Sequence, residues 1–212
     1  MLRELLEHPE VTEICELRGR IGLMAYHGGN LERSTDAVAR EVADRTGASL
    51  YAVLQQSPLR RHLGSLHFDP AHSPALARFL GHVDTAISIH GYGRESMWHH
   101  LLVGGRNRVF AKHVAGHLRD AIPSRYFVVD TLEAIPKELR GQHPRNPVNR
   151  PTNAGVQIEL PPTIRWNHAE KGWSDHEGTT RSEGVHRLID GLSAAVEAWL
   201  HPSDRTTGDD AG

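Results

Sequence analysis

Residues 21–32 read IGLMAYHGGNLE, an apolar run that stops at a histidine and two glycines. A buried strand that ends in a glycine-rich turn before a helix is how open α/β sheets build sites at the carboxyl ends of their strands. A helical pattern opens soon afterwards, at residues 34–36. His27 and Glu32 are of residue types that bind zinc, and the two glycines allow the turn to bring both side chains to one point. For this stretch alone, the alternative is a turn whose polar side chains only face water.

A second short apolar run ends in the same chemistry. Residues 85–89 read TAISI and are followed by His90 and Gly91. If the two runs are neighbouring parallel strands, His27, Glu32 and His90 lie along one edge of the sheet. Two histidines and one carboxylate leave a coordination position open for water, which is the ligand set of a catalytic zinc. The sequence therefore predicts a zinc site at this edge.

A third stretch supplies a candidate base. Residues 155–160, GVQIEL, alternate as a strand does and place Glu159 on the opposite face from Ile158. A positioned carboxylate can take a proton from water and return it to a leaving group. The alternative is a strand carboxylate held in a salt bridge.

Four motifs together resemble the poly-γ-glutamate hydrolase family: HGGNLE (27–32), SIHGYG (88–93), VNR (148–150) and GVQIELPPTIR (155–165). These are small zinc-dependent amidohydrolases, phage-borne in the best-known case, with a core similar to zinc carboxypeptidases. The resemblance covers about residues 18–200 and implies zinc on His27, Glu32 and His90, with Glu159 as the catalytic carboxylate. Zinc carboxypeptidases space the first histidine and glutamate three apart, whereas here the offset is five. Their specificity for a terminal carboxylate is therefore not carried over.

Apolar runs alternate with helical patterns along the chain. Strands are expected over residues 18–26, 49–54, 85–89, 126–129 and 155–160, and residues 98–103 form a further apolar stretch. Helices are expected over residues 2–8, 35–47, 73–81, 106–121 and 185–199, with Thr35 and Ser73 as caps. This order predicts an α/β fold with a mostly parallel or mixed open sheet and helices on both faces. It agrees with the zinc carboxypeptidase-like core that the resemblance implies.

Length, charge and hydropathy limit the class of protein. The chain has 212 residues and a net charge of -2, with a pI near 6.8. We expect a single domain over residues 1–202 and a disordered tail over 203–212. The amino-terminal residues lack the apolar core of a signal peptide, and no run is long enough to span a membrane. A cytoplasmic protein without a membrane partner is the expectation.

Several residues are candidates for binding substrate. Arg150 and Arg165 bracket the strand of Glu159, and a guanidinium fork suits a substrate carboxylate. Ordinary surface arginines are the alternative. His62 and Ser65 lie in a loop where the family has a similar histidine-to-serine segment, and for them a plain surface loop is the alternative. Residues 133–153 are basic and rich in proline, as a polyanion-binding loop or a solvated connection would be.

The expected function is zinc-dependent hydrolysis of γ-glutamyl amide bonds in poly-γ-glutamate or a similar acidic chain, with Glu159 as general base. One alternative is a zinc amidohydrolase that acts on a small N-acyl or γ-glutamyl compound. Another is a non-enzymatic phage-type protein that binds nucleic acid through residues 140–150. The near-neutral pI and the absence of interleaved aromatic residues count against nucleic acid.

Overall fold

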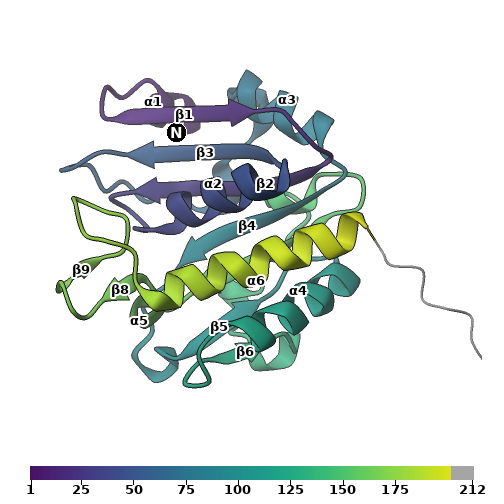
Figure 1. Cartoon of the computed structure of the whole chain (residues 1–212). Coiled ribbons are helices and arrows are strands. Elements are labelled where there is room, and N and C mark those ends of the chain that lie inside the picture. The colour runs from purple at the N-terminus through teal and green to yellow at the C-terminus, as the bar shows by residue number, and fades with distance from the viewer. Residues whose placement is uncertain (202–212) are drawn as a thin grey trace, which may run out of the picture.

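Seven strands form one mixed sheet in the order β1-β3-β2-β4-β7-β5-β6 (Figure 1). The computed structural model describes residues 1–201. Four neighbouring pairs are parallel (β2–β3, β2–β4, β4–β7 and β5–β6), and two are antiparallel (β1–β3 and β5–β7). The predicted α/β class with a mixed open sheet is confirmed. The strands are β1 (Val11–Glu16), β2 (Ile21–Gly29), β3 (Ser49–Gln55), β4 (Thr85–Gly91), β5 (His100–Val103), β6 (Phe127–Val129) and β7 (Gly155–Leu160).

Helices cover both faces of the sheet because the central strands are apolar on both sides. In β2, Leu23 and Ala25 pack with the helices α2 (Thr35–Thr46), α4 (Arg108–Ala121) and α6 (Glu183–Leu200). The alternate residues Met24 and Tyr26 pack on the other face with α1 (Leu2–Leu6) and α3 (Pro74–His82). Figure 1 shows α6 crossing in front of the strands, between α2 and α4. Near-continuous apolar strands are typical of a sheet buried on both faces.

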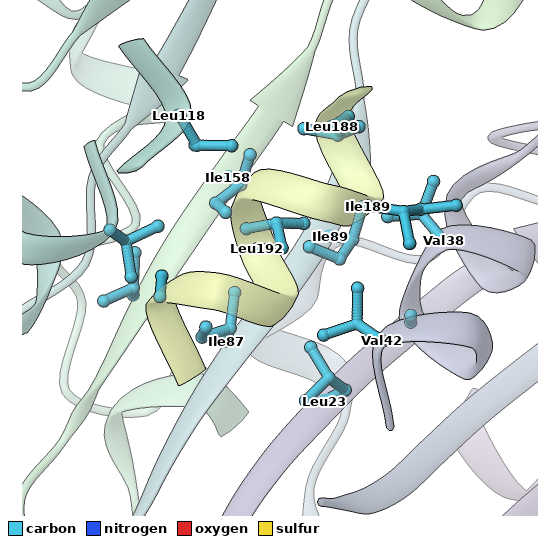
Figure 2. Packing of buried hydrophobic residues seen from close by; sticks show 14 of the residues in the cluster. Leu23, Val38, Val42, Ile87, Ile89, Leu118, Ile158, Leu188, Ile189 and Leu192 are labelled. Carbon is cyan, nitrogen blue, oxygen red and sulfur yellow. The ribbon is translucent and has the colours of Figure 1, made fainter. Parts of the chain in front are cut away.

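The larger core lies under α6. Figure 2 shows Leu192 of this helix between Ile158 and Ile89 of the sheet, with Leu188 one turn away on the same helix. All four side chains are fully buried. Burying such a side chain contributes roughly 1.5–3 kcal/mol. This packing anchors α6 on β4 and β7, the strands that carry His90 and Glu159.

One strand was missed, and one predicted helix cap was wrong. The strand β1 was missed because its sequence, VTEICE, alternates with charged residues and its side chains are only partly buried. Charged side chains are common on an edge strand, where they discourage pairing with other chains. Thr35 is not the cap of α2: Ser34 holds that position with a left-handed φ of 74° and makes no side-chain cap bond. The Thr35 hydroxyl instead donates to the Glu32 carbonyl at 2.6 Å.

Short elements fill the rest of the described chain. The predicted cap at Ser73 is confirmed, since its hydroxyl accepts from the Leu76 amide at 2.9 Å. The short helix α5 (Pro162–Arg165) leads into a hairpin of β8 (Trp166–Asn167) and β9 (Gly172–Trp173). In Figure 1 the arrowheads of β2, β3 and β4 point to the side of the molecule where this hairpin lies. Six 3₁₀ turns complete the structure: η1 (Ser65–His67), η2 (Pro70–His72), η3 (Glu95–Met97), η4 (Leu132–Ala134), η5 (Lys137–Leu139) and η6 (Pro147–Asn149).

Two expectations concern the ends and the environment of the chain. The predicted disordered tail, residues 203–212, lies outside the described residues. Within residues 1–201, no helix has both the length and the apolar character that a membrane crossing requires.

Candidate metal centre and active site

Three neighbouring strands end at the same edge of the sheet. β2 carries His27, β4 carries His90, and β7 carries Glu159 in register with His90. Glu32 follows β2 in the turn before α2, and its backbone amide donates to the His27 carbonyl at 2.9 Å. Gly29 gives this turn its left-handed φ of 67°, a conformation that glycine adopts without steric cost. The structure thus brings together His27, Glu32 and His90.

The Glu32 carboxylate faces both imidazoles. Its Oε1 lies 2.9 Å from Nδ1 of His27, and its Oε2 lies 3.3 Å from Nδ1 of His90. Oε2 also accepts from the Gly91 amide at 3.0 Å. Both histidines therefore turn the same ring nitrogen towards one carboxylate.

The hydrogen bonds of His27 fit a metal ligand. Its Nε2 lies 2.8 Å from the Leu63 carbonyl oxygen, which only accepts, so Nε2 carries a hydrogen. In a neutral imidazole, Nδ1 then presents a lone pair to a carboxylate oxygen 2.9 Å away. Nδ1 of His27 and Oε1 of Glu32 would then both be acceptors, and two acceptors this close repel each other unless a proton or a metal cation lies between them. An imidazole whose other nitrogen donates to a backbone carbonyl is the usual support for a metal ligand, so this donor set fits zinc.

The charges of the cluster favour the metal-binding form of Glu32. Burial alone would raise the pKa of this carboxyl group, but the neighbouring His27 and His90 hold it well below its usual range. Burial would likewise lower the pKa of His27, yet attraction to Glu32 outweighs this effect and raises it. Glu32 is therefore ionised at neutral pH, as a zinc ligand must be.

A third histidine lies beside these residues. His27, Glu32 and His62 each offer one ligand atom, a ring nitrogen or a carboxylate oxygen, and these three atoms lie within 4.8 Å of one another. The ring centroids of His27 and His62 are 5.1 Å apart. His62 comes from the exposed loop after β3, whereas His90 is 3 % exposed and its Nε2 has no partner within residues 1–201. Burial, followed by the positive charge of His27, lowers the pKa of His62.

Glu159 is buried, and its pKa is raised. Burial raises its pKa to about 7, although the neighbouring His90 opposes this effect. Its Oε1 accepts from Nε2 of Gln157 at 2.9 Å, and within residues 1–201 no side chain or amide donates to its Oε2. No cation lies within 4 Å of this carboxylate in the described part of the chain. A carboxyl group with a pKa near neutrality is suited to both take and return a proton.

A buried hydrogen-bond chain orients Gln157. The Tyr26 hydroxyl donates to Oδ1 of Asn146 at 2.8 Å, and Nδ2 of Asn146 donates to Oε1 of Gln157 at 2.7 Å. Each amide is thereby held in one orientation, so that the amino group of Gln157 faces Glu159. Sequence reasoning missed this chain, although Gln157 precedes Glu159 by two and strand alternation puts both on one face.

The burial of Glu159 predicts how stability depends on pH in metal-free protein. Because the folded-state pKa of about 7 exceeds the ordinary value of 4.5, this group favours folding most below pH 4.5, and the benefit is lost as pH rises to about 7. From pH 4.5 to 8, the unfolding free energy should fall by about 3 kcal/mol relative to Glu159→Gln. Urea unfolding with chelator measures this difference. An identical difference at both pH values would contradict the prediction.

A cationic cavity opens beside Glu32. It encloses about 230 Å³ and is lined by Glu32, Arg33, Arg60, Tyr92 and Arg165, among others. Arg165 is 5 % exposed, and its guanidinium donates to the carbonyls of Arg33 at 3.0 Å and Tyr92 at 3.4 Å. Its Nε has no partner, and no carboxylate of residues 1–201 forms a salt bridge with it. Burial lowers its pKa to about 10, so it remains a cation at neutral pH.

The other candidate substrate residues are placed differently. Ser65 lines a second cavity of about 610 Å³, together with Gln157, Lys137 and Arg140. Arg150 precedes β7 and lines neither of these two cavities. Nη1 of Arg150 lies 3.7 Å from Oδ1 of Asp69.

Comparisons with known proteins show what the chain is similar to. A family model described as poly-gamma-glutamate hydrolase matches residues 3–190. Two Bacillus subtilis (strain 168) proteins are similar in sequence. The UPF0714 protein YndL is 31% identical over 141 residues, 65% of this chain and 52% of its own. The SPbeta prophage-derived UPF0714 protein YoqZ is 32% identical over 143 residues, which are 66% of this chain and 48% of that protein. The chain thus spans about half the length of these curated relatives.

Solved structures share the fold. A bacteriophage poly-gamma-glutamate hydrolase superposes with a TM-score of 0.76 at 22% identity, over 92% of this chain and 91% of the other. A zinc-free form of YndL gives a TM-score of 0.72 at 23% identity, over 90% of this chain and 92% of the other. N-formylglutamate amidohydrolase from Ralstonia eutropha JMP134 gives a TM-score of 0.50 at 13% identity, over 93% of this chain and 99% of the other. At these identities, the likeness is one of fold.

Proposed function

The chain belongs to the poly-γ-glutamate hydrolase family, and from this premise we propose that it cleaves γ-glutamyl amide bonds of an acidic chain at the edge formed by β2, β4 and β7. The observation that carries the proposal is the buried guanidinium of Arg165. It lacks a carboxylate partner within residues 1–201 and lines the same cavity as Glu32. Because an unpaired buried charge is costly, a substrate carboxylate is its natural partner.

His27, Glu32 and His90 would hold zinc in this proposal. We assign the third position to His90 because it is buried on a strand, whereas His62 lies on an exposed loop. When bound, zinc lowers the pKa of a water molecule and polarises the scissile carbonyl. The Leu63 carbonyl holds the ring of His27 in place through Nε2.

Glu159 would move the proton. Its free Oε2 accepts a proton from the attacking water and returns it to the leaving amide nitrogen. Gln157 holds the other oxygen at 2.9 Å, so the carboxylate does not rotate away. Its pKa of about 7 lies close to the value at which both transfers are efficient.

Cations of the 230 Å³ cavity would hold the substrate. Every residue of a γ-linked glutamate chain carries one free carboxylate beside its backbone. Arg165 offers a fork that is already fixed by two carbonyls, and Arg33 and Arg60 line the same space. A pre-positioned guanidinium binds a carboxylate with little further loss of side-chain entropy.

A substrate comparison tests this proposal. Short γ-linked glutamate chains with free carboxylates should be turned over about 100-fold faster, or more, than the same chains with amidated carboxylates, because a buried charge pair broken on one side costs ~2–5 kcal/mol. Arg165→Met should narrow this ratio, whereas Arg145→Met, at an exposed position, should preserve it. Equal rates on both substrates in the unmodified protein would reject the proposal.

A further inference from the structure

Three of the four tryptophans of the chain gather beside the candidate active site. Trp98, Trp166 and Trp173 line a cavity of about 260 Å³, together with Pro162, Thr163 and His168. We call this cavity the tryptophan pocket. Its accessible surface is apolar, and Trp98 is 45 % exposed. An apolar, aromatic-lined depression beside a catalytic site is typical of a ligand-binding surface.

The walls of the tryptophan pocket are held in place. Trp166 and Trp173 are directly paired in the β8–β9 hairpin, and their rings meet edge to face at 5.3 Å and 84°. The Thr163 hydroxyl donates to the Trp98 carbonyl, which ties the third tryptophan to α5. The pocket is therefore preformed, and a ligand does not have to assemble it.

The tryptophan pocket shares walls with the cationic cavity. Pro162 and Trp173 line both spaces. The Arg165 guanidinium lies 5.0 Å from the ring centroid of Trp173, and that of Arg33 lies 5.7 Å from it. One ligand can therefore place a carboxylate against Arg165 and an attached group against the tryptophans.

We propose that the tryptophan pocket is a subsite for a planar aromatic group attached to the γ-glutamyl substrate. This inference rests on the proposed function and extends it to aryl-capped γ-glutamyl compounds. An aromatic ring gains from edge-to-face contacts with the indoles. A cavity of roughly 150 Å³ accepts benzene, so 260 Å³ has room for one arylamide ring.

Matched ligands test the subsite. Short γ-linked glutamate chains capped with benzoyl at the amino end, or with anilide at the carboxyl end, are compared with acetyl and methylamide caps. We expect at least one aryl cap to lower Kd about 5–10-fold, the effect of an aromatic pair worth ~1 kcal/mol. Trp98→Ala should remove this preference. Phe127→Ala removes another exposed aromatic side chain (59 % exposed) that lies outside the pocket. This variant should retain the preference for aryl caps.

The outcomes separate this inference from the proposed function. If chains with aryl and alkyl caps are cleaved and bound equally well, the subsite is refuted while the proposed function stands. If no γ-glutamyl compound is cleaved, the proposed function fails, and quenching of tryptophan fluorescence by the aryl-capped chains still tests the pocket. Weaker binding of the aryl-capped chains to Trp98→Ala than to the unmodified protein, measured by calorimetry because the substitution itself removes a fluorophore, would support the subsite. Equal Kd values in Trp98→Ala and the unmodified protein would overturn it.

Discussion

Replacement of Glu159 by glutamine is expected to lower turnover of γ-linked glutamate chains by about 10²–10⁴-fold, the usual contribution of a general base. Glutamine keeps the shape of the side chain and its contact with Gln157 but cannot accept the proton of the attacking water. Zinc content should stay unchanged, because Glu159 is not needed as a fourth ligand if the metal keeps a position open for water. Elemental analysis, a melting curve and turnover of one substrate on the same preparation measure these effects.

A strand carboxylate outside the site provides the control. Glu13 lies on β1 and accepts from the Tyr51 hydroxyl at 2.7 Å, so Glu13→Gln makes the same chemical change on a strand that β3 separates from β2. This variant should retain turnover per folded molecule. The competing role for Glu159, a salt-bridged strand residue, finds no cation within 4 Å in residues 1–201. Normal turnover in Glu159→Gln would mean that the base lies elsewhere.

The central strands and their ends could be predicted from sequence because their signals are local. Each of β2, β4 and β7 is an apolar run that ends at a polar residue, and parallel strands place such ends at one edge. The expected meeting of His27 with His90 follows from this rule and is what the structure shows. The helices could be predicted for the same reason, since apolar residues recur at helical spacing.

Features that depend on distant segments could not be predicted. The ion pair of Arg150 with Asp69 joins two segments that are far apart in the sequence, and no local pattern predicts it. Arg165 gave no sign of being buried, because contacts with the carbonyls of Arg33 and Tyr92, far away in sequence, enclose it. The tryptophan pocket likewise joins residue 98 to residues 166 and 173. In each case the decisive contact joins segments that are far apart in the sequence, and no sequence pattern links those segments.

Replacement of Glu32 by glutamine is expected to act on metal binding rather than on proton transfer. Both oxygens of Glu32 are engaged, Oε1 facing His27 and Oε2 facing His90 and the Gly91 amide. Glutamine removes the negative charge and leaves a neutral amide oxygen, which is a poorer zinc ligand than a carboxylate. Loss of a supporting partner of a ligand already weakens metal affinity about 10–100-fold, so loss of an anionic ligand should cost at least that much.

Zinc affinity and zinc-dependent stability measure this effect without reference to turnover. Competition with a chromophoric chelator should give a Kd for zinc that is raised by about 10²-fold or more in Glu32→Gln and is nearly unchanged in Glu159→Gln. Since a ligand that binds only the folded state stabilises it in proportion to ln(1 + [L]/Kd), added zinc should raise Tm in Glu159→Gln and much less in Glu32→Gln. Equal zinc affinity in the two variants would show that Glu32 is not a ligand. The opposite responses of these two carboxylates, one in metal affinity and one in rate, distinguish a zinc hydrolase from a fold that only holds a polar cluster at its sheet edge.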